Sequence, residues 1–290
     1  MCKEKHEVMA AIDVGSNSLR MMIAQVTSEG EIIPLEDLYM PTYIGRDTFS
    51  FGRIQLESIH DTCETLKGFL KVMKDYKVNS YRAVSTSGIR EAENREYVLD
   101  QIKTRTGLEV EVINNAQERF LMSKAIRNYM SSEMKFLDKG TLIVDIRSGG
   151  VEISVYDKGD LKLTEYLKIG SLRLKEILAS LERRSLDFPG LMQEFIDSRI
   201  DFMKQILPKF NIKGFVGLGG ELKTIIELSS KKKDNKFKPK IKKEELKNLY
   251  DRVYRLTTPQ IIEEFKISSH QAEILVPSII LFNSFLEMTN

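Results

Sequence analysis

The chain has 290 residues, of which 42% are hydrophobic and 30% charged, and it is long enough for two globular domains of ordinary size. Its 44 basic residues against 42 acidic ones give a net charge of +2, so overall charge argues neither for nor against a polyanionic partner. The two cysteines, Cys2 and Cys63, are too few for a disulfide framework or a zinc site. Cys63 lies on an apolar helical stripe, which predicts a core thiol.

Turn signals divide the first half of the chain into short strands and longer helices. The elements expected there, in chain order, are strands at residues 8–12, 19–26 and 31–35, a helix at 54–76, a strand at 81–84, a charged helix at 91–104, a strand at 108–113 and a helix at 117–129. Gly107 is expected to close the charged helix. A strand meander followed by alternating strands and helices indicates a mixed α/β layer.

The second half repeats this order. Its expected elements are strands at residues 141–144, 152–156 and 161–167, helices at 171–181 and 191–207, a strand at 214–216, and a helical remainder. We therefore expect two domains, residues 1–130 and 131–290. The apolar run at residues 274–282 is too short to span a bilayer, and the first residues show no signal-peptide pattern, so a cytoplasmic protein without a membrane partner is expected.

One strand–turn–strand pattern with an aspartate at the strand end occurs once in each half of the chain. Residues 11–18 and 143–150 each predict a buried strand, an aspartate at its end, a tight turn of small residues and a returning strand. The aspartates are Asp13 and Asp145. Two such hairpins about half a chain apart suggest related halves whose turns face each other across a cleft.

Small-residue turns follow several strand ends. They lie at residues 15–18, 85–88, 148–150 and 217–220. Such turns expose backbone amides and hydroxyls that can hold phosphate oxygens, although each taken singly is typical of a plain turn. Their recurrence on two similar halves favours the phosphate interpretation. No Walker phosphate loop, dinucleotide fingerprint, histidine metal pair or nucleophile elbow is present in the sequence.

Charged residues beside these turns have two interpretations each. Asp13 and Asp145 are either turn caps or ligands of Mg²⁺, and Glu152 could point into the same space. Glu118 lies at the start of a predicted helix, where a glutamate usually does no more than interact favourably with the helix dipole. Arg90 could equally be an ordinary surface residue. The lysine-rich run between residues 229 and 243 is either a solvated loop or a basic rim beside a polyanionic substrate.

Taken in order, these segments resemble the exopolyphosphatase and guanosine pentaphosphate phosphatase family. That family belongs to the actin-like, sugar-kinase and Hsp70 ATPase superfamily. The segments similar to its motifs are residues 13–20, 86–94, 111–118, 145–152, 170–174 and 217–220. The resemblance implies two actin-like (ribonuclease H-like) domains, each a mixed sheet flanked by helices, with a cleft between them. It covers nearly the whole chain.

The resemblance also implies residue roles by matching position. Glu118 would be the general base that activates water against the terminal phosphorus. Asp145 and Glu152 would organise Mg²⁺, and Asp13 is a further metal candidate from its own place at a strand end. The residues expected to bind the phosphate oxygens of polyphosphate or guanosine pentaphosphate are Gly15, Ser16, Asn17, Arg90, Arg147, Ser148, Gly149, Gly150, Gly219 and Gly220. DNA is not expected as a partner, and a homodimer is plausible by analogy alone.

The chain departs from the family pattern at several positions: Gln117 stands for a glutamate, Arg147 for a glycine, Gly150 and Val151 for a serine and a threonine, and Glu221 for a small hydroxyl residue. Arg147 could add a phosphate contact, occupy the metal position or obstruct close approach of the backbone. These departures keep open a second hypothesis, a weakened family member that binds polyphosphate or nucleotide alarmones as a sensor. An ATP-dependent sugar-kinase-like transferase is a third, against which Glu118 argues.

Overall fold

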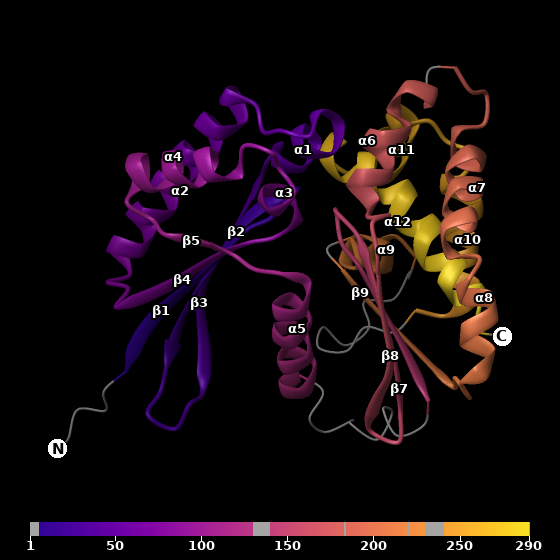
Figure 1. Ribbon diagram of the computed structural model, residues 1–290, viewed down its shortest axis with the longest axis horizontal. Helices are drawn as coiled ribbons and strands as arrows, with labels where there is room; N and C mark the ends of the chain where they lie inside the picture. The colour runs from indigo at the N-terminus through magenta and orange to yellow at the C-terminus, as the bar shows by residue number, and fades with distance from the viewer. Residues whose placement is uncertain (1–5, 130–139, 183, 220, 230–240, 290) are drawn as a thin grey trace. The chain divides into compact units, whose positions relative to one another are not determined.

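The computed structural model describes residues 6–129, 140–182, 184–219, 221–229 and 241–289 (Figure 1). Two compact units make up the chain, Met1–Met122 and Ser123–Asn290, and the division falls within helix α5 (Asn115–Tyr129). The expected boundary between residues 130 and 131 lies outside the described residues and stays a prediction. Each unit is an α/β layer, as the order of strands and helices predicted.

The first unit is built on a five-stranded mixed sheet of order β3-β2-β1-β4-β5. Its strands are β1 (Glu7–Val14), β2 (Ser18–Val26), β3 (Ile32–Pro41), β4 (Ser80–Ser85) and β5 (Val110–Val112). The first three form an antiparallel meander, while β4 runs parallel to β1 and β5 parallel to β4. Alternate residues of β1 and β2, such as Ile12 and Met21, are buried, because one face of the sheet packs on helices.

Four helices of this unit precede α5 among the described residues. They are α1 (Ile44–Phe51), α2 (Leu56–Asp75), α3 (Ser87–Arg90) and α4 (Arg95–Thr106). Helices α2 and α4 lie side by side (Figure 1), and Cys63 is fully buried in this core, which confirms the core thiol. Gly107 ends α4 in the left-handed conformation with φ 76°, as predicted. The charged helix starts at Arg95 rather than near residue 91, because residues 87–90 form a separate turn of helix.

The second unit carries a four-stranded sheet of order β8-β7-β6-β9. Its strands are β6 (Thr141–Ile146), β7 (Val151–Asp157), β8 (Asp160–Leu167) and β9 (Gly214–Gly219). This order matches that of β3, β2, β1 and β4, since a meander again meets one parallel strand. The two units therefore share a topology, which accounts for the repeated sequence pattern.

Helices account for most of the rest of the second unit. They are α6 (Ser171–Glu182), α7 (Phe188–Ile200), α8 (Met203–Ile206), the short 3₁₀ helix η2 (Leu207–Lys209), α9 (Leu222–Ser229), α10 (Lys243–Val253), α11 (Thr258–Phe265) and α12 (Ser269–Glu287). The single helix expected at residues 191–207 is divided into α7, α8 and η2. Among the described residues, no helix combines the length and apolar character needed to cross a membrane.

The late glycine segment also differs from its prediction as a turn. Residues 217–219 belong to β9, and Gly220 lies outside the described residues. A Cβ at Gly217 would lie 2.9 Å from the ring of Phe282, and one at Gly219, whose φ is +135°, would lie 2.1 Å from the carbonyl oxygen of Ile146. These two glycines therefore serve the close packing of β9 against α12 and β6.

Candidate active site

The two aspartate-bearing hairpins have the same turn. Four residues, 15–18 and 147–150, join the paired strands in each case. In the first turn the amide of Gly15 donates to the carbonyl of Ser18 at 3.0 Å, and in the second the amide of Arg147 donates to the carbonyl of Gly150 at 3.0 Å. The duplication seen in the sequence thus extends to the hydrogen bond that closes each turn.

Two backbone amides of the first turn point away from the segment at residues 42–45, to which the turn is hydrogen-bonded. The carbonyls of Ser16 and Asn17 accept hydrogen bonds from the amides of Gly45 (2.7 Å) and Thr42 (3.1 Å). In a trans peptide the carbonyl and the following amide point in opposite directions, and no cis bond occurs in the chain as described. The amides of Asn17 and Ser18 therefore point away from the α1 segment, as a phosphate-binding turn requires.

In the second turn two carbonyls are held in a similar way, but one position earlier than in the first turn. The carbonyls of Arg147 and Ser148 accept from the amides of Ser171 (3.1 Å) and Arg173 (3.0 Å), at the start of α6. By the same trans geometry, the amides of Ser148 and Gly149 point away from α6. Each unit thus presents a pair of turn amides of the kind that binds phosphate oxygens.

Gly170 is needed for the close approach of the second turn to α6. A Cβ there would lie 2.2 Å from the nitrogen of Gly150 and 2.4 Å from the carbonyl oxygen of Arg147. Beside it, the Nε of Arg173 donates to the carbonyl of Gly149 at 2.6 Å. The segment at residues 170–174, similar to a family motif, therefore holds the turn by its backbone and by one guanidinium.

In the first unit the structure brings two of the predicted turns together. The hydroxyls of Ser16 and Ser87 lie 3.0 Å apart, and both side chains are buried. A Cβ on Gly88 would lie 3.0 Å from the Cα of Ser16, so glycine permits this contact. The hydroxyl of Thr48 donates to the carbonyl of Gly88 at 2.7 Å. These contacts fix Thr48, Ser87 and Gly88, which are far from the first turn in sequence, beside it in the structure.

Glu118 stands in the first turn of α5, whose start is fixed by a capping box. The side chain of Asn114 accepts from the amide of Gln117 at 2.9 Å, and the side chain of Gln117 accepts from the amide of Asn114 at 2.8 Å. Gln117, a departure from the family pattern, thus has a local structural role. The helix dipole favours a carboxylate at this position, and the side chain of Glu118 is only 6% exposed.

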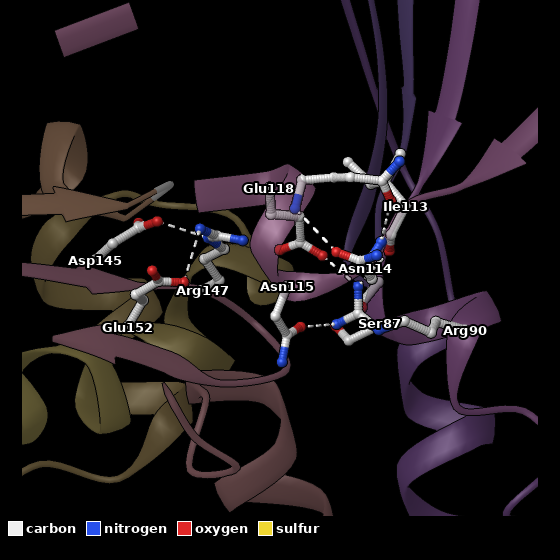
Figure 2. A network of polar contacts seen from close by, with 11 residues as sticks. Ser87, Arg90, Ile113, Asn114, Asn115, Glu118, Asp145, Arg147 and Glu152 are labelled. Atoms are coloured by element: carbon white, nitrogen blue, oxygen red, sulfur yellow. Dashed lines mark hydrogen bonds and ion pairs between the residues drawn. The ribbon is translucent and has the colours of Figure 1, made fainter. Parts of the chain in front are cut away.

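Arg90 holds this carboxylate in place (Figure 2). One guanidinium nitrogen, Nη1, donates to Oε1 of Glu118 and to the carbonyl of Ile113 at 2.7 Å, and Nη2 donates to Oδ1 of Asn115 at 2.6 Å. A guanidinium held by several acceptors in a largely buried site fixes the orientation of its carboxylate partner. Arg90 was expected to bind phosphate, and the structure shows it bonded to these protein acceptors.

The second hairpin brings two carboxylates and a guanidinium together (Figure 2). Asp145 and Glu152 are directly opposite each other across β6 and β7, and both are buried. The Nε of Arg147 lies 2.6 Å from Oδ2 of Asp145, and its Nη2 lies 4.0 Å from Oε2 of Glu152. Burial and the Glu152 carboxylate raise the pKa of Asp145 to about 7.

The carboxylates of Asp145 and Glu152 are the ones that would hold Mg²⁺. A magnesium ion takes oxygen ligands at about 2.0–2.1 Å in a near-octahedral shell. The guanidinium of Arg147, which carries a permanent positive charge, contacts the same carboxylates. The described residues also contain no group of three or more histidine, cysteine, aspartate or glutamate side chains suited to a metal ion. As arranged here, this set does not fit a divalent cation.

The other predicted site residues are placed as follows. Asp13 is exposed, with Arg20 as its partner across β1 and β2, and Asn17 is 8% exposed. Three contributors were not predicted for the site: Asn115, the carbonyl of Ile113, and Arg173. Arg173 could have been found, since it stands in the motif-like segment at residues 170–174. Ile113 and Asn115 also stand in a motif-like segment, residues 111–118, but nothing in the sequence indicates that they bond to Arg90.

Comparison with known proteins identifies the family. Residues 22–290 match the model of the Ppx/GppA phosphatase family, and the chain belongs to it. The Mycobacterium tuberculosis protein "Exopolyphosphatase 2" is 26% identical over 230 residues, 76% of this chain and 70% of that protein. "Guanosine-5'-triphosphate,3'-diphosphate pyrophosphatase" of Vibrio parahaemolyticus is 21% identical over 223 residues, 76% of this chain and 43% of that protein.

A solved structure shows the same fold. The crystal structure of the Aquifex aeolicus member of the Ppx/GppA family superimposes with a TM-score of 0.75 at 24% identity, covering 98% of this chain and 91% of that one. The actin-like α/β class predicted from the motifs is thereby confirmed. The chain spans about a quarter to a half of the length of other curated relatives that it matches.

Proposed function

We propose that the protein is a phosphohydrolase that releases terminal phosphate from inorganic polyphosphate or from guanosine pentaphosphate. The observation that carries the proposal is the buried carboxylate of Glu118 at the start of α5, held by the guanidinium fork of Arg90. A carboxylate fixed in this way suits a general base. Membership of the phosphatase family and the names of the two relatives support the substrate class.

In the proposed reaction, Glu118 accepts a proton from the water that attacks the terminal phosphorus. The bond from the terminal phosphorus to the bridging oxygen breaks, and the shortened polyphosphate or nucleotide leaves with the bonding electrons while the terminal group is released as phosphate. Hydrolysis of a phosphoric anhydride depends mainly on positioning and on neutralising charge at the phosphate oxygens. The turn amides at residues 17–18, in the same unit as Glu118, are the groups proposed to contact those oxygens, and the amides at residues 148–149 are the corresponding phosphate-binding candidates of the second unit.

Mg²⁺ supplies Lewis acidity and charge neutralisation in many phosphoryl-transfer sites. Because Arg147 already contacts the two carboxylates that would hold it here, no step of this mechanism uses the ion. A cofactor role for Mg²⁺, binding as a homodimer and a cytoplasmic location all stay predictions. The same holds for the expected absence of DNA and membrane partners.

The direct test is phosphate release from polyphosphate and, separately, from guanosine pentaphosphate. Each substrate is incubated with the purified protein, with Mg²⁺ present in one series and omitted in the other. We expect release that is linear with protein concentration on at least one substrate. Release no faster than that of the buffer on both substrates, in both series, would overturn the proposal.

One observation favours a second function, a protein that binds these ligands without turnover. Arg147 reaches across the carboxylates of the second turn, where the family pattern has a glycine. Calorimetry with polyphosphate and with guanosine pentaphosphate separates the two functions. A heat of binding without phosphate release would favour the sensor, whereas the absence of any binding would exclude it.

Arg90 provides a prediction for the proposed base. Replacing it with lysine keeps the charge but removes the fork that bonds Glu118, Ile113 and Asn115. We expect kcat to fall by about 10- to 100-fold with KM little changed, because a misplaced base slows only the chemical step. Steady-state kinetics measure both constants. Arg95→Lys, at an exposed first position of α4, is the matched control and should leave both unchanged.

A large rise in KM at unchanged kcat would contradict this positioning role. It would show instead that Arg90 contributes to ground-state binding of substrate, as the motif resemblance implied.

A further inference from the structure

The second hairpin faces an electrostatic problem that the first does not. Asp13 in the first hairpin lies opposite Arg20 across the strands, which pairs unlike charges. The equivalent pair in the second hairpin is Asp145 and Glu152, two carboxylates directly opposite each other. Like charges in this relation destabilise a strand pair, and burial increases the cost. A cation between or beside the two carboxylates relieves this repulsion.

Arg147 meets this need from within the turn itself. Its guanidinium contacts Asp145 at 2.6 Å and approaches Glu152 at 4.0 Å. The carboxylate side chains are each 5% exposed, while that of Arg147 is 25% exposed, so the pair is shielded and the guanidinium reaches it from the more open side. An arginine side chain does not lose its proton in a protein, so this charge is fixed.

The backbone shows why this residue is suited to the role. Arg147 is the first residue of its turn, the position that Gly15 occupies in the first hairpin, and both amides close their turns at 3.0 Å. The turn therefore keeps its shape with an arginine at this position. A side chain that starts two residues after Asp145 on a closed turn can fold back onto that carboxylate.

We propose that Arg147 is a built-in cation that takes the place of a divalent metal ion at the Asp145–Glu152 pair. The guanidinium and a divalent ion compete for the same carboxylate oxygens, and each repels the other. In the wild-type protein the carboxylate pair therefore does not bind a divalent cation, and removing the guanidinium allows it to do so. This inference concerns cation binding alone, so it stands or falls separately from the proposed hydrolysis.

Binding of Mn²⁺, measured by electron paramagnetic resonance on the full chain, tests the proposal. Five proteins are compared: wild type, Arg147→Gly, Arg147→Lys, Asp145→Asn and the double variant Arg147→Gly with Asp145→Asn. We expect Arg147→Gly to bind Mn²⁺ at least about tenfold more tightly than wild type, since one repelling charge beside the site is gone. Arg147→Lys should resemble wild type, and the double variant should lose the gain. Thermal unfolding followed by circular dichroism, with and without Mg²⁺, should show added stability from the ion only in Arg147→Gly.

Two results would overturn the proposal. The first is a Mn²⁺ ion on the wild-type protein that is lost in Asp145→Asn, which would show that Arg147 and the metal coexist. This comparison does not depend on whether Arg147→Gly folds. The second is a folded Arg147→Gly variant that binds no more Mn²⁺ than wild type, which would show that the carboxylate pair is not a cation site in either form.

Discussion

Replacing Glu118 with glutamine is expected to lower kcat for phosphate release by about 10²- to 10⁴-fold, the usual contribution of a general base. Glutamine keeps the shape of the side chain and can still accept a hydrogen bond from Arg90, but it cannot take a proton from water. Because the change is confined to the chemical step, KM for polyphosphate should change little. Initial rates of phosphate release at several substrate concentrations give both constants.

The matched control for this variant is Glu96→Gln. Glu96 also stands in the first turn of a helix, α4, but its side chain is 81% exposed. It should retain wild-type activity and stability. If Glu118→Gln retained wild-type kcat while the wild-type protein released phosphate, Glu118 would not be the base, although the protein would still be a hydrolase.

The second large effect is expected at Gly170, on the stability of the fold. Alanine there places a Cβ 2.2 Å from the nitrogen of Gly150 and 2.4 Å from the carbonyl oxygens of Arg147 and Ser148, all of them backbone atoms. Backbone cannot swing aside as a side chain does, so the turn or the start of α6 has to move. We expect Gly170→Ala to lower the free energy of unfolding by about 3 kcal/mol. Urea-induced unfolding followed by circular dichroism measures this change.

Gly68→Ala is the opposite control. Gly68 lies in α2, and a Cβ there would meet no atom within 4 Å. Alanine is the better helix former, so this variant should raise the free energy of unfolding by about 0.5–1 kcal/mol. Gly170→Ala with the stability of wild type would show that the turn and α6 are not held together as tightly as the distances indicate.

Much of the fold could be predicted because the hydrophobic pattern and the turn residues agree with it. The meander of each unit was predicted from alternating strands, and Gly107 was identified as the end of α4 from residue type alone. The helix α1, in contrast, was missed. Its eight residues carry no long apolar period, and its place depends on tertiary contacts such as that of Thr48 with Gly88.

Several residues of the site could be predicted from the sequence, but their contacts could not. Motif resemblance selected Glu118, Asp145 and Glu152, but it did not show what each contacts. The bond from Arg90 to Glu118 joins residues 28 positions apart in sequence, and no local pattern encodes such a pair. The sequence left three alternatives open for Arg147, and its contact with Asp145 and its approach to Glu152 are visible only in the structure.

The hydrogen bonds between the second turn and α6 have a consequence for any anion that the turn binds. The amides of Ser171 and Arg173 belong to the first turn of α6, where a helix has no internal acceptors, and the turn carbonyls satisfy them. Helix α6 is in turn tied to α12 by the ion pair of Lys175 and Glu273 at 2.6 Å. The turn cannot rearrange without exposing those helix amides. A phosphate group would therefore meet a turn that is already ordered, and little conformational entropy would be lost on binding.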